Sequence, residues 1–399
     1  MESNQNIIPS TSDEYFADIR PLLDSEVQEH LQELVQMPEI KGIIANFLGN
    51  IPEDEFANLI SSIQSVSAFK RQLLEPVVRV IQKRSTFSLT SSGKSNLDRS
   101  GAEKYLFITN HRDIILDSAF LNALMLEAGM SMPRIAIGDN LLIKPWIHTL
   151  VRMADAFIVK RKPSVREMLE ESKKLSTYIR SSVYYNEESV WLAQSEGRRK
   201  DSNDRTQASV LKMLSMSSSE KDIAKALEPL KITPVAITYE YDPCDYLKAQ
   251  EMLQKKLNPE WKKSPMDDLI NMQTGLEGQK GRVHFSISQP LRDLTSVTNG
   301  VKDKKEALTM IANEIDHQLF LNYRFYPSHY AAYDLLFGGS EFQGMYSVKE
   351  RANFELYLDE QISKVKVDGK KDSDFLRNKL LEMYSTPLKN HLLARKELR

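Results

Sequence analysis

Cysteine is almost absent: Cys244 is the single one among 399 residues. One thiol cannot close an intrachain disulfide, and it cannot supply the two or four cysteine ligands of the common structural zinc sites. We therefore expect a protein of a reducing, cytoplasmic compartment.

Long apolar runs are also missing. The best candidate, RIAIGDNLLIKPWIHTLV at residues 134–151, is interrupted by Asp139, Lys144 and Pro145. It falls short of the roughly 18 uninterrupted apolar residues that a membrane-spanning helix needs. The first residues, MESNQNIIPSTSDEYF, lack the basic and apolar regions of a secretory signal. We expect no transmembrane helix, while peripheral contact with a membrane stays open.

Neither sign of charge dominates. The formal net charge is −2, with 41% hydrophobic and 27% charged residues. This is the composition of a folded soluble protein, and no global positive field would hold a nucleic acid. The length favours more than one domain.

The hydrophobic pattern divides the chain into three parts. Residues 24–85 have helical periodicity, and we expect a small helical bundle over residues 1–85. Over residues 86–302, β-rich runs alternate with helical stretches, which is typical of an α/β domain with a mostly parallel sheet flanked by helices. A helical C-terminal extension is expected over residues 303–399. The seven candidate strands read FSLTSS, KYLFITN, PRIAIGD, AFIVKR, SVWLAQS, ITPVAITYEY and RVHFSIS.

Residues 110–118 read NHRDIILDS, in which HRD could belong to a protein kinase. A kinase carries an Asn five residues after that Asp, where this chain has Ser118. DFG and G-x-G-x-x-G are both missing, and the preceding region is helical where a kinase has its β-rich lobe. We reject the kinase interpretation.

His111 follows an apolar run, so we expect it at the carboxyl end of a strand, where α/β sheets place their chemistry. Asp113 is suited to cap the following helix, and Asp117 is expected in its first turn. A carboxylate beside a histidine fixes its tautomer and stabilises the imidazolium, so the pair can act as a general base. We favour Asp117 as the orienting residue and keep Asp113 as the alternative.

Two further strand ends carry clustered basic residues. AFIVKRK ends with Arg161 and Lys162, and SVWLAQSEGRRKD turns at Gly197 and continues with Arg198 and Lys200. Cations at two strand ends of the sheet that holds the histidine could form a phosphate site.

These motifs together resemble the glycerolipid acyltransferase superfamily, which includes lysophosphatidate and glycerol-3-phosphate acyltransferases. The resemblance rests on Asn-His with a nearby Asp, a strand ending in Arg, an EGR turn and a PVAI strand, in that order. VWLAQSEGRRKDSND is most similar to the soluble plastid-type glycerol-3-phosphate acyltransferases, which also carry a helical bundle and lack membrane spans. The resemblance covers roughly residues 80–300.

The resemblance implies roles for individual residues. The catalytic base is His111, the basic pair after the second motif is Arg161 and Lys162, the phosphate-binding pair is Arg198 and Lys200, and the turn opens with Glu196 and Gly197. One departure concerns spacing. The superfamily places four residues between its His and Asp, whereas five separate His111 from Asp117. Extra loop before the helix has to absorb the rotation of about 100° that one helical residue adds.

The implied activity is an O-acyltransferase of phospholipid synthesis, moving a fatty acyl group from a thioester to the hydroxyl of glycerol 3-phosphate. Lysophosphatidate or another lipid hydroxyl is the alternative acceptor, and a non-catalytic lipid- or carrier-protein-binding module is the alternative class. No metal or bound cofactor is implied. The expected partners are acyl-carrier protein or acyl-CoA as donor and a phosphorylated glycerol as acceptor. The expected location is the cytoplasm, with contact at the inner face of the membrane as a further alternative.

Overall fold

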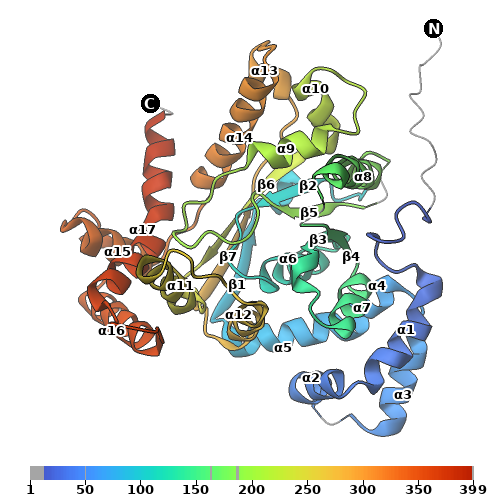
Figure 1. The fold of residues 1–399 in the computed structure, drawn as a ribbon, viewed down its shortest axis with the longest axis horizontal. Coiled ribbons are helices and arrows are strands. Elements are labelled where there is room, and N and C mark those ends of the chain that lie inside the picture. Colours follow the sequence, from blue (N-terminus) through green and yellow to red (C-terminus); the bar gives the residue numbers. More distant parts are fainter. Residues whose placement is uncertain (1–12, 50, 162–163, 186–187, 398–399) are drawn as a thin grey trace.

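A computed structural model describes residues 13–49, 51–161, 164–185 and 188–397. A central sheet is covered by helices on both faces, and the N-terminal and C-terminal helices lie at opposite ends of the molecule (Figure 1). The expected α/β fold with helical regions at both ends is confirmed. Within the described ranges, no helix is long and apolar enough to cross a lipid bilayer.

All seven β-rich runs form strands. Their bounds are β1 (Ser88–Ser92), β2 (Leu106–Thr109), β3 (Arg134–Gly138), β4 (Ala156–Val159), β5 (Val190–Ala193), β6 (Ile232–Tyr239) and β7 (Arg282–Ile287). They pair in the order β1-β7-β6-β2-β5-β3-β4. Strands β2 to β6 are parallel to one another. β7 runs antiparallel to β6, and β1 is parallel to β7. The segments that follow β2, β4, β5 and β6 therefore emerge at one edge of the sheet.

The helices fall into three groups along the chain. The N-terminal group is α1 (Asp24–Gln36), α2 (Pro38–Leu48), α3 (Glu53–Ser62), α4 (Val66–Phe69), the π-helical η1 (Lys70–Leu74) and α5 (Glu75–Ser85). Helices between the strands are η2 (Lys94–Asn96), α6 (Leu116–Glu127), η3 (Asp139–Leu141), α7 (Pro145–Met153), α8 (Val165–Tyr184), α9 (Ala208–Ser215), α10 (Ile223–Leu227), η4 (Glu228–Leu230), α11 (Asp245–Leu257) and α12 (Pro265–Glu277). The last group is α13 (Leu294–Thr298), α14 (Lys304–Leu321), α15 (Pro327–Phe337), η5 (Gln343–Met345), α16 (Val348–Lys364) and α17 (Ser373–Glu397).

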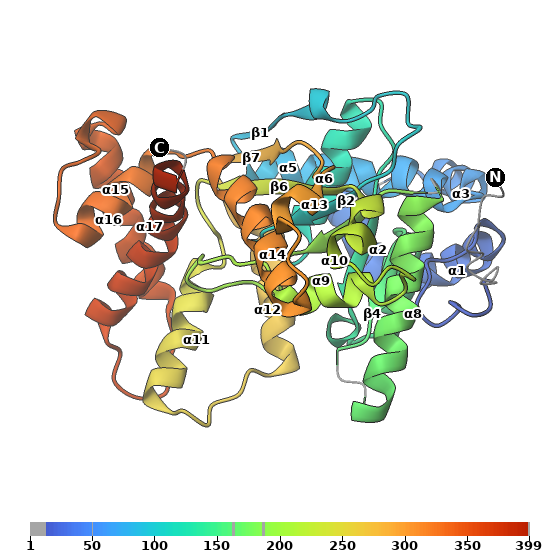
Figure 2. The same cartoon turned by 90° about the horizontal axis from the view of Figure 1, so that it is seen from above.

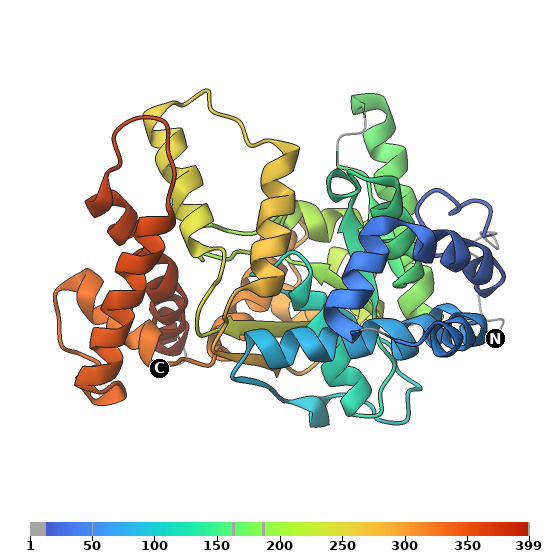
Figure 3. The same cartoon turned by 90° about the horizontal axis from the view of Figure 1, so that it is seen from below.

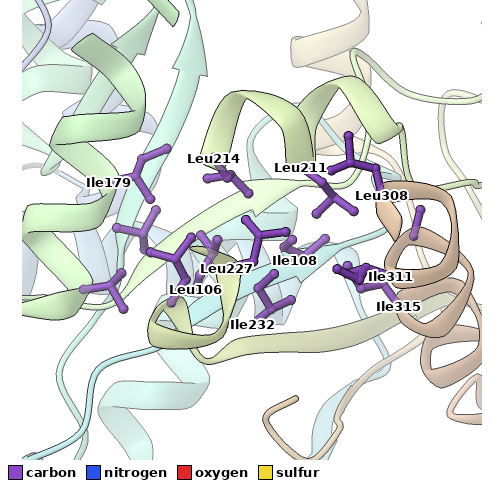
Figure 4. Close-up of a cluster of buried hydrophobic side chains, with 14 of the residues drawn as sticks. Leu106, Ile108, Ile179, Leu211, Leu214, Leu227, Ile232, Leu308, Ile311 and Ile315 are labelled. Carbon is purple, nitrogen blue, oxygen red and sulfur yellow. The ribbon is translucent and has the colours of Figure 1, made fainter. Parts of the chain in front are cut away.

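Both faces of the sheet are apolar, as expected for parallel strands between helices. On one face, side chains of β2 and β6 pack under α8, α9, α10 and α14 (Figure 4). The labelled members of this cluster are Leu106, Ile108, Ile179, Leu211, Leu214, Leu227, Ile232, Leu308, Ile311 and Ile315. On the other face, residues such as Phe107 and Phe285 pack against α5 and α6.

The C-terminal helices contribute to two different cores. α14 packs on the sheet, although the sequence pattern places it in the extension that begins at residue 303. α15, α16 and α17 instead form a separate apolar cluster with α11 (Figures 2 and 3). The three-part division at residues 85 and 302 stays a prediction, since α14 belongs by packing to the α/β layer.

A π turn joins α4 to α5. Pro76 has no N–H, so the helical hydrogen bond to the carbonyl of Gln72 cannot form there. One residue earlier, the Glu75 N–H donates to the Lys70 carbonyl, five residues back. The turn carries the Lys70 side chain, which is only 5% exposed, toward the sheet.

Lys70 links the N-terminal helices to the α/β domain. Its ammonium lies 2.9 Å from the Asp155 carboxylate, just before β4, and Arg134 lies 3.3 Å from the other carboxylate oxygen. Ion pairs this deep are costly to break, because the remaining charge loses its partner in a poorly solvated place.

We therefore expect Lys70→Met to lower the free energy of unfolding by about 3 kcal/mol, even though Arg134 still faces Asp155. Urea denaturation measures this value. Lys41→Met, at an exposed lysine of α2, is the control and should change stability by less than about 0.5 kcal/mol. Equal stabilities of the two variants would contradict the proposed linkage.

Candidate active site

Asn110 fixes the end of β2. Its side-chain amide donates to the carbonyl of Ile237 at 2.9 Å and accepts from the Ile237 N–H at 2.8 Å. The side chain thus imitates a paired strand residue and continues the contact between β2 and β6 beyond Thr109. The next residue, His111, is held at the carboxyl edge of the sheet.

His111 and Asp117 are brought together. The Nδ1 atom of His111 lies 2.8 Å from Oδ2 of Asp117, and the two side chains are 15% and 0% exposed. The same oxygen accepts the backbone N–H groups of Arg112, at 2.6 Å, and Asp113, at 3.1 Å. Three donors hold the buried carboxylate, so the ring of His111 has a fixed orientation, and its edge contacts Trp191.

Asp113 turns away from the histidine and caps the helix start. Its Oδ1 accepts the backbone N–H groups of Ile115, at 2.9 Å, and Leu116, at 2.8 Å. Burial raises the pKa of Asp113, the charge of Asp117 adds to the rise, and Lys280 opposes it. Asp113 therefore accepts hydrogen bonds from backbone N–H groups at the start of the helix, and Asp117 is the carboxylate that contacts His111.

The extra residue between His111 and Asp117 is accommodated before the helix. α6 begins only at Leu116, so residues 112–115 form a loop that returns Asp117 to the histidine. Because the additional residue lies in this loop, it adds no rotation within the helix.

Arg112 ties this loop to the segment after the basic turn. Its guanidinium forms a buried ion pair with Asp204 and donates to the Ser202 hydroxyl at 2.5 Å. Lys248 donates to the Arg112 carbonyl at 3.3 Å. Arg112, the arginine of HRD, thus fixes the loop to the segment that contains Ser202 and Asp204, and these contacts occupy its guanidinium.

The EGR turn follows β5 at the same edge. Gly197 has φ +70°, a left-handed conformation that favours glycine. Glu196 precedes it and pairs with Arg161 at 3.1 Å, joining the ends of β5 and β4. Lys162, the other basic residue expected there, lies outside the described residues.

Arg198 reaches from the turn to α12. Its Nη2 donates to Oδ1 of Asn271 at 3.0 Å, while its buried Nη1 has no hydrogen-bond partner in the part of the chain that the structure describes. One helical turn further along α12, a Cβ atom at Gly275 would overlap the Asp113 carboxylate. Arg198 and the His111 loop therefore lie against the same face of α12.

Lys200 is engaged elsewhere. Its ammonium lies 2.6 Å from Glu251 of α11. Burial lowers the pKa of Lys200, and the Glu251 carboxylate opposes that shift. Among the predicted phosphate ligands that the structure describes, Arg198 and Arg161 each have a buried nitrogen without a hydrogen-bond partner, Nη1 and Nε respectively. Arg161 and Lys200 already face carboxylates, whereas Arg198 faces the neutral amide of Asn271.

A large apolar cavity opens beside His111. Its volume is about 1110 Å³, and its lining includes His111, Glu196 and Arg161 at the sheet edge. Apolar side chains of α2, α5, α6, α7 and α12 contribute to the remaining wall, together with residues of β3, β4, β5, α8 and α9. The N-terminal helices, for which the sequence pattern provided no role, therefore line a cavity that contains the histidine.

Asn271, Arg112 and Asn110 are site residues to which the sequence analysis assigned no role. Asn110 was detectable, because it belongs to the Asn-His motif. Asn271 had no signal, since it lies 73 residues from Arg198 on a helix without any motif.

The α/β domain matches a known family. Residues 88–238 fit the model of a family described as Acyltransferase, and this range includes His111, Asp117 and the EGR turn. The protein is an acyltransferase. Residues 88–238 thus form a domain of the Acyltransferase family.

A solved structure is also similar to this chain. It is the 1-acyl-sn-glycerophosphate (LPA) acyltransferase PlsC from Thermotoga maritima, with 11% sequence identity and a TM-score of 0.31. The match covers 76% of this chain and 96% of that one. No curated protein sequence matches significantly.

Exchanging each aspartate for asparagine separates their roles. Asp117→Asn should lower turnover by about 100-fold or more, because the amide no longer fixes the tautomer or stabilises the imidazolium. Asp113→Asn should retain most activity, since asparagine also caps helices well. Steady-state kinetics on folded variants measures both. Loss of activity with Asp113→Asn alone would reverse the assignment.

Proposed function

We propose that the protein transfers a fatty acyl group from a thioester to the hydroxyl of glycerol 3-phosphate. The observation that carries this proposal is that His111 belongs at once to a buried His–Asp pair and to the wall of an apolar cavity. A histidine that only supported the fold would need no access to such a cavity.

The base in this mechanism is Nε2 of His111. Asp117 engages Nδ1, and no hydrogen bond to Nε2 is found among the described residues. Nε2 removes the proton of the acceptor hydroxyl as its oxygen attacks the thioester carbonyl. The tetrahedral intermediate collapses with loss of the thiolate, which takes the proton from the imidazolium. Asp117 stabilises that imidazolium while it exists.

The thioester's acyl chain would occupy the apolar cavity. A saturated chain of sixteen carbons occupies on the order of 400 Å³, taking each buried methylene as close-packed. The cavity of about 1110 Å³ holds such a chain with room for the acceptor. Acyl-carrier protein or acyl-CoA is the proposed donor, with no metal or bound cofactor.

The acceptor's phosphate would bind at Arg198. An arginine with a buried, unpaired Nη1 is suited to a phosphate oxygen, because charge-assisted hydrogen bonds are stronger than neutral ones. Arg161 and Lys200 would join it by exchanging their present carboxylate partners for phosphate. Lysophosphatidate offers the same phosphate and remains the alternative acceptor.

A non-catalytic lipid- or carrier-protein-binding module is less well supported. Such a module needs the cavity but has no use for a buried carboxylate that three donors hold against a histidine.

His111→Ala should abolish acyl transfer while leaving the fold intact. Purified protein would be incubated with an acyl thioester and, separately, glycerol 3-phosphate, lysophosphatidate and glycerol, and products identified by mass. Wild type should acylate glycerol 3-phosphate best, and the variant should fall by about 1000-fold or more. An active, folded His111→Ala protein would refute the mechanism, and preference for lysophosphatidate would replace the acceptor only.

Arg198→Met should raise KM for glycerol 3-phosphate by about 10- to 100-fold, the value of one or two lost charge-assisted hydrogen bonds. Slow transfer to glycerol, which has no phosphate, should not change. Arg99→Met, at an exposed arginine after β1, is the matched control and should leave KM unchanged. An equal effect of Arg198→Met on both acceptors would show that the turn has only a structural role.

A further inference from the structure

Tyr239, the last residue of β6, has a buried hydroxyl that no described residue binds. The side chain is 4% exposed and belongs to the same buried cluster as Leu116 and Phe120 of α6. The strand register agrees with this position, because Asn110 pairs with the backbone of Ile237 and Tyr239 is the next β6 residue on the same face. A phenol buried without a partner is costly, so its position at the site calls for a cause.

One oxygen of Asp117 is also unpaired. The three donors of the site, His111 and two backbone N–H groups, all bind Oδ2. The buried Oδ1 has no hydrogen-bond partner within the described ranges. An unpaired donor at the end of β6 and an unpaired acceptor at the start of α6 therefore lie on the same face of the sheet.

The charges around Tyr239 indicate that the two groups are close. Burial raises the pKa of Tyr239 well above its ordinary value, and the charge of Asp117 is the next largest cause. Asp113 and Asp242 add to the rise. Among three carboxylates the phenol keeps its proton, so it acts as a hydrogen-bond donor.

Asp117 is the carboxylate that fits this donor. Asp113 accepts two backbone N–H groups at the helix start. Asp242 is paired with Lys248 and accepts the backbone N–H of Cys244. Of the three, Asp117 is the one for which the described residues leave a buried oxygen without a partner.

The other titratable groups beside Tyr239 are weaker acceptors. They line a small internal cavity of about 30 Å³ together with Tyr239, and they are Arg112, Asp242, Tyr323, His329 and Tyr384. Arg112 only donates, and it is paired with Asp204. Burial lowers the pKa of His329 to about 4, so its ring is neutral near pH 7. A neutral acceptor binds a phenol less strongly than a carboxylate does.

We propose that the Tyr239 hydroxyl donates a hydrogen bond to Oδ1 of Asp117 and thereby positions the catalytic base. Tyr239 is a positioning residue, because it acts on His111 through Asp117. The inference rests on the proposed function, to which it adds the third member of the chain His111–Asp117–Tyr239. With both oxygens engaged, the carboxylate resists rotation about its Cβ–Cγ bond, and the plane of the imidazole is held.

Tyr239→Phe removes the hydroxyl and keeps the ring. Each donor withdraws charge from the carboxylate that it binds, so loss of the Tyr239 bond should strengthen the bond from Nδ1 of His111. In ¹H NMR of substrate-free protein, the Nδ1 proton of His111, assigned by its loss in His111→Ala, should move to lower field. This readout needs no turnover, so it tests the inference even if the proposed function fails.

The same variant should change the kinetics in a way that a packing defect would not. A donor to Asp117 favours the more negative, unprotonated form of the His–Asp pair, and its loss favours the protonated form. The midpoint of the acidic limb of kcat/KM should therefore rise by about 0.5 to 1 pH unit. At the pH optimum kcat should fall about 3- to 10-fold, the value of one hydrogen bond, with KM for both substrates unchanged.

Tyr105→Phe is the matched control. Tyr105 is 1% exposed in the same buried cluster, and its hydroxyl donates to Glu103 at 2.9 Å, at the end of β2 remote from His111. This variant should lower the melting temperature, because it too loses a hydroxyl. It should leave the His111 proton signal, the pH profile and kcat unchanged.

A ring-fluorinated tyrosine at position 239 tests the same bond with the hydroxyl in place, should Tyr239→Phe fail to fold. Its phenol is more acidic and donates more strongly, so both shifts should reverse, the proton signal to higher field and the acidic limb to lower pH. The proposal is overturned if folded Tyr239→Phe leaves the proton signal and the acidic limb where the wild type has them, whatever its kcat. It is overturned equally if the fluorinated protein moves neither.

Discussion

The hydrogen bond between His111 and Asp117 is the constraint on which the site depends. Asp117 is fully buried, and the imidazole and two backbone N–H groups that donate to it offset the cost of burying a carboxylate there. Those donors require the loop at residues 112–115 to fold back on the helix start. Asn110, Arg112 and Asp113 each fasten part of that loop, to β6, to Asp204 and to α6 respectively.

The site also depends on helices distant in sequence. α12 contacts the His111 loop through Gly275 and holds Arg198 through Asn271, while its other residues line the cavity. α2 and α5 complete the cavity wall, and the Lys70–Asp155 pair fixes their segment to the sheet. One arrangement thus joins the base, the basic turn and the apolar space.

Local pattern was enough to predict the sheet and the position of the histidine. Each strand is a short apolar run between helical stretches, and His111 directly follows one, so its place at the sheet edge needed no tertiary information. The preference for Asp117 over Asp113 agrees with the hydrogen bonds in the structure. Asp113 accepts backbone N–H groups at the start of α6, whereas Asp117 lies within hydrogen-bonding distance of His111.

The partners of the basic residues were not predictable. Lys200 meets Glu251 and Arg198 meets Asn271 through the packing of α11 and α12, which no local signal encodes. The cavity could not be predicted from the sequence either, because the helices that line it have the same hydrophobic periodicity as helices of a bundle without a cavity.

The most direct test of this account is the tautomer of His111, read by nitrogen NMR on protein with ¹⁵N-labelled histidine, with the signal assigned by its loss in His111→Ala. The account predicts a neutral ring protonated at Nδ1, hydrogen-bonded to Asp117, with an unprotonated Nε2 that can accept the substrate proton. A neutral ring protonated at Nε2 would leave no base facing the acceptor and would contradict it.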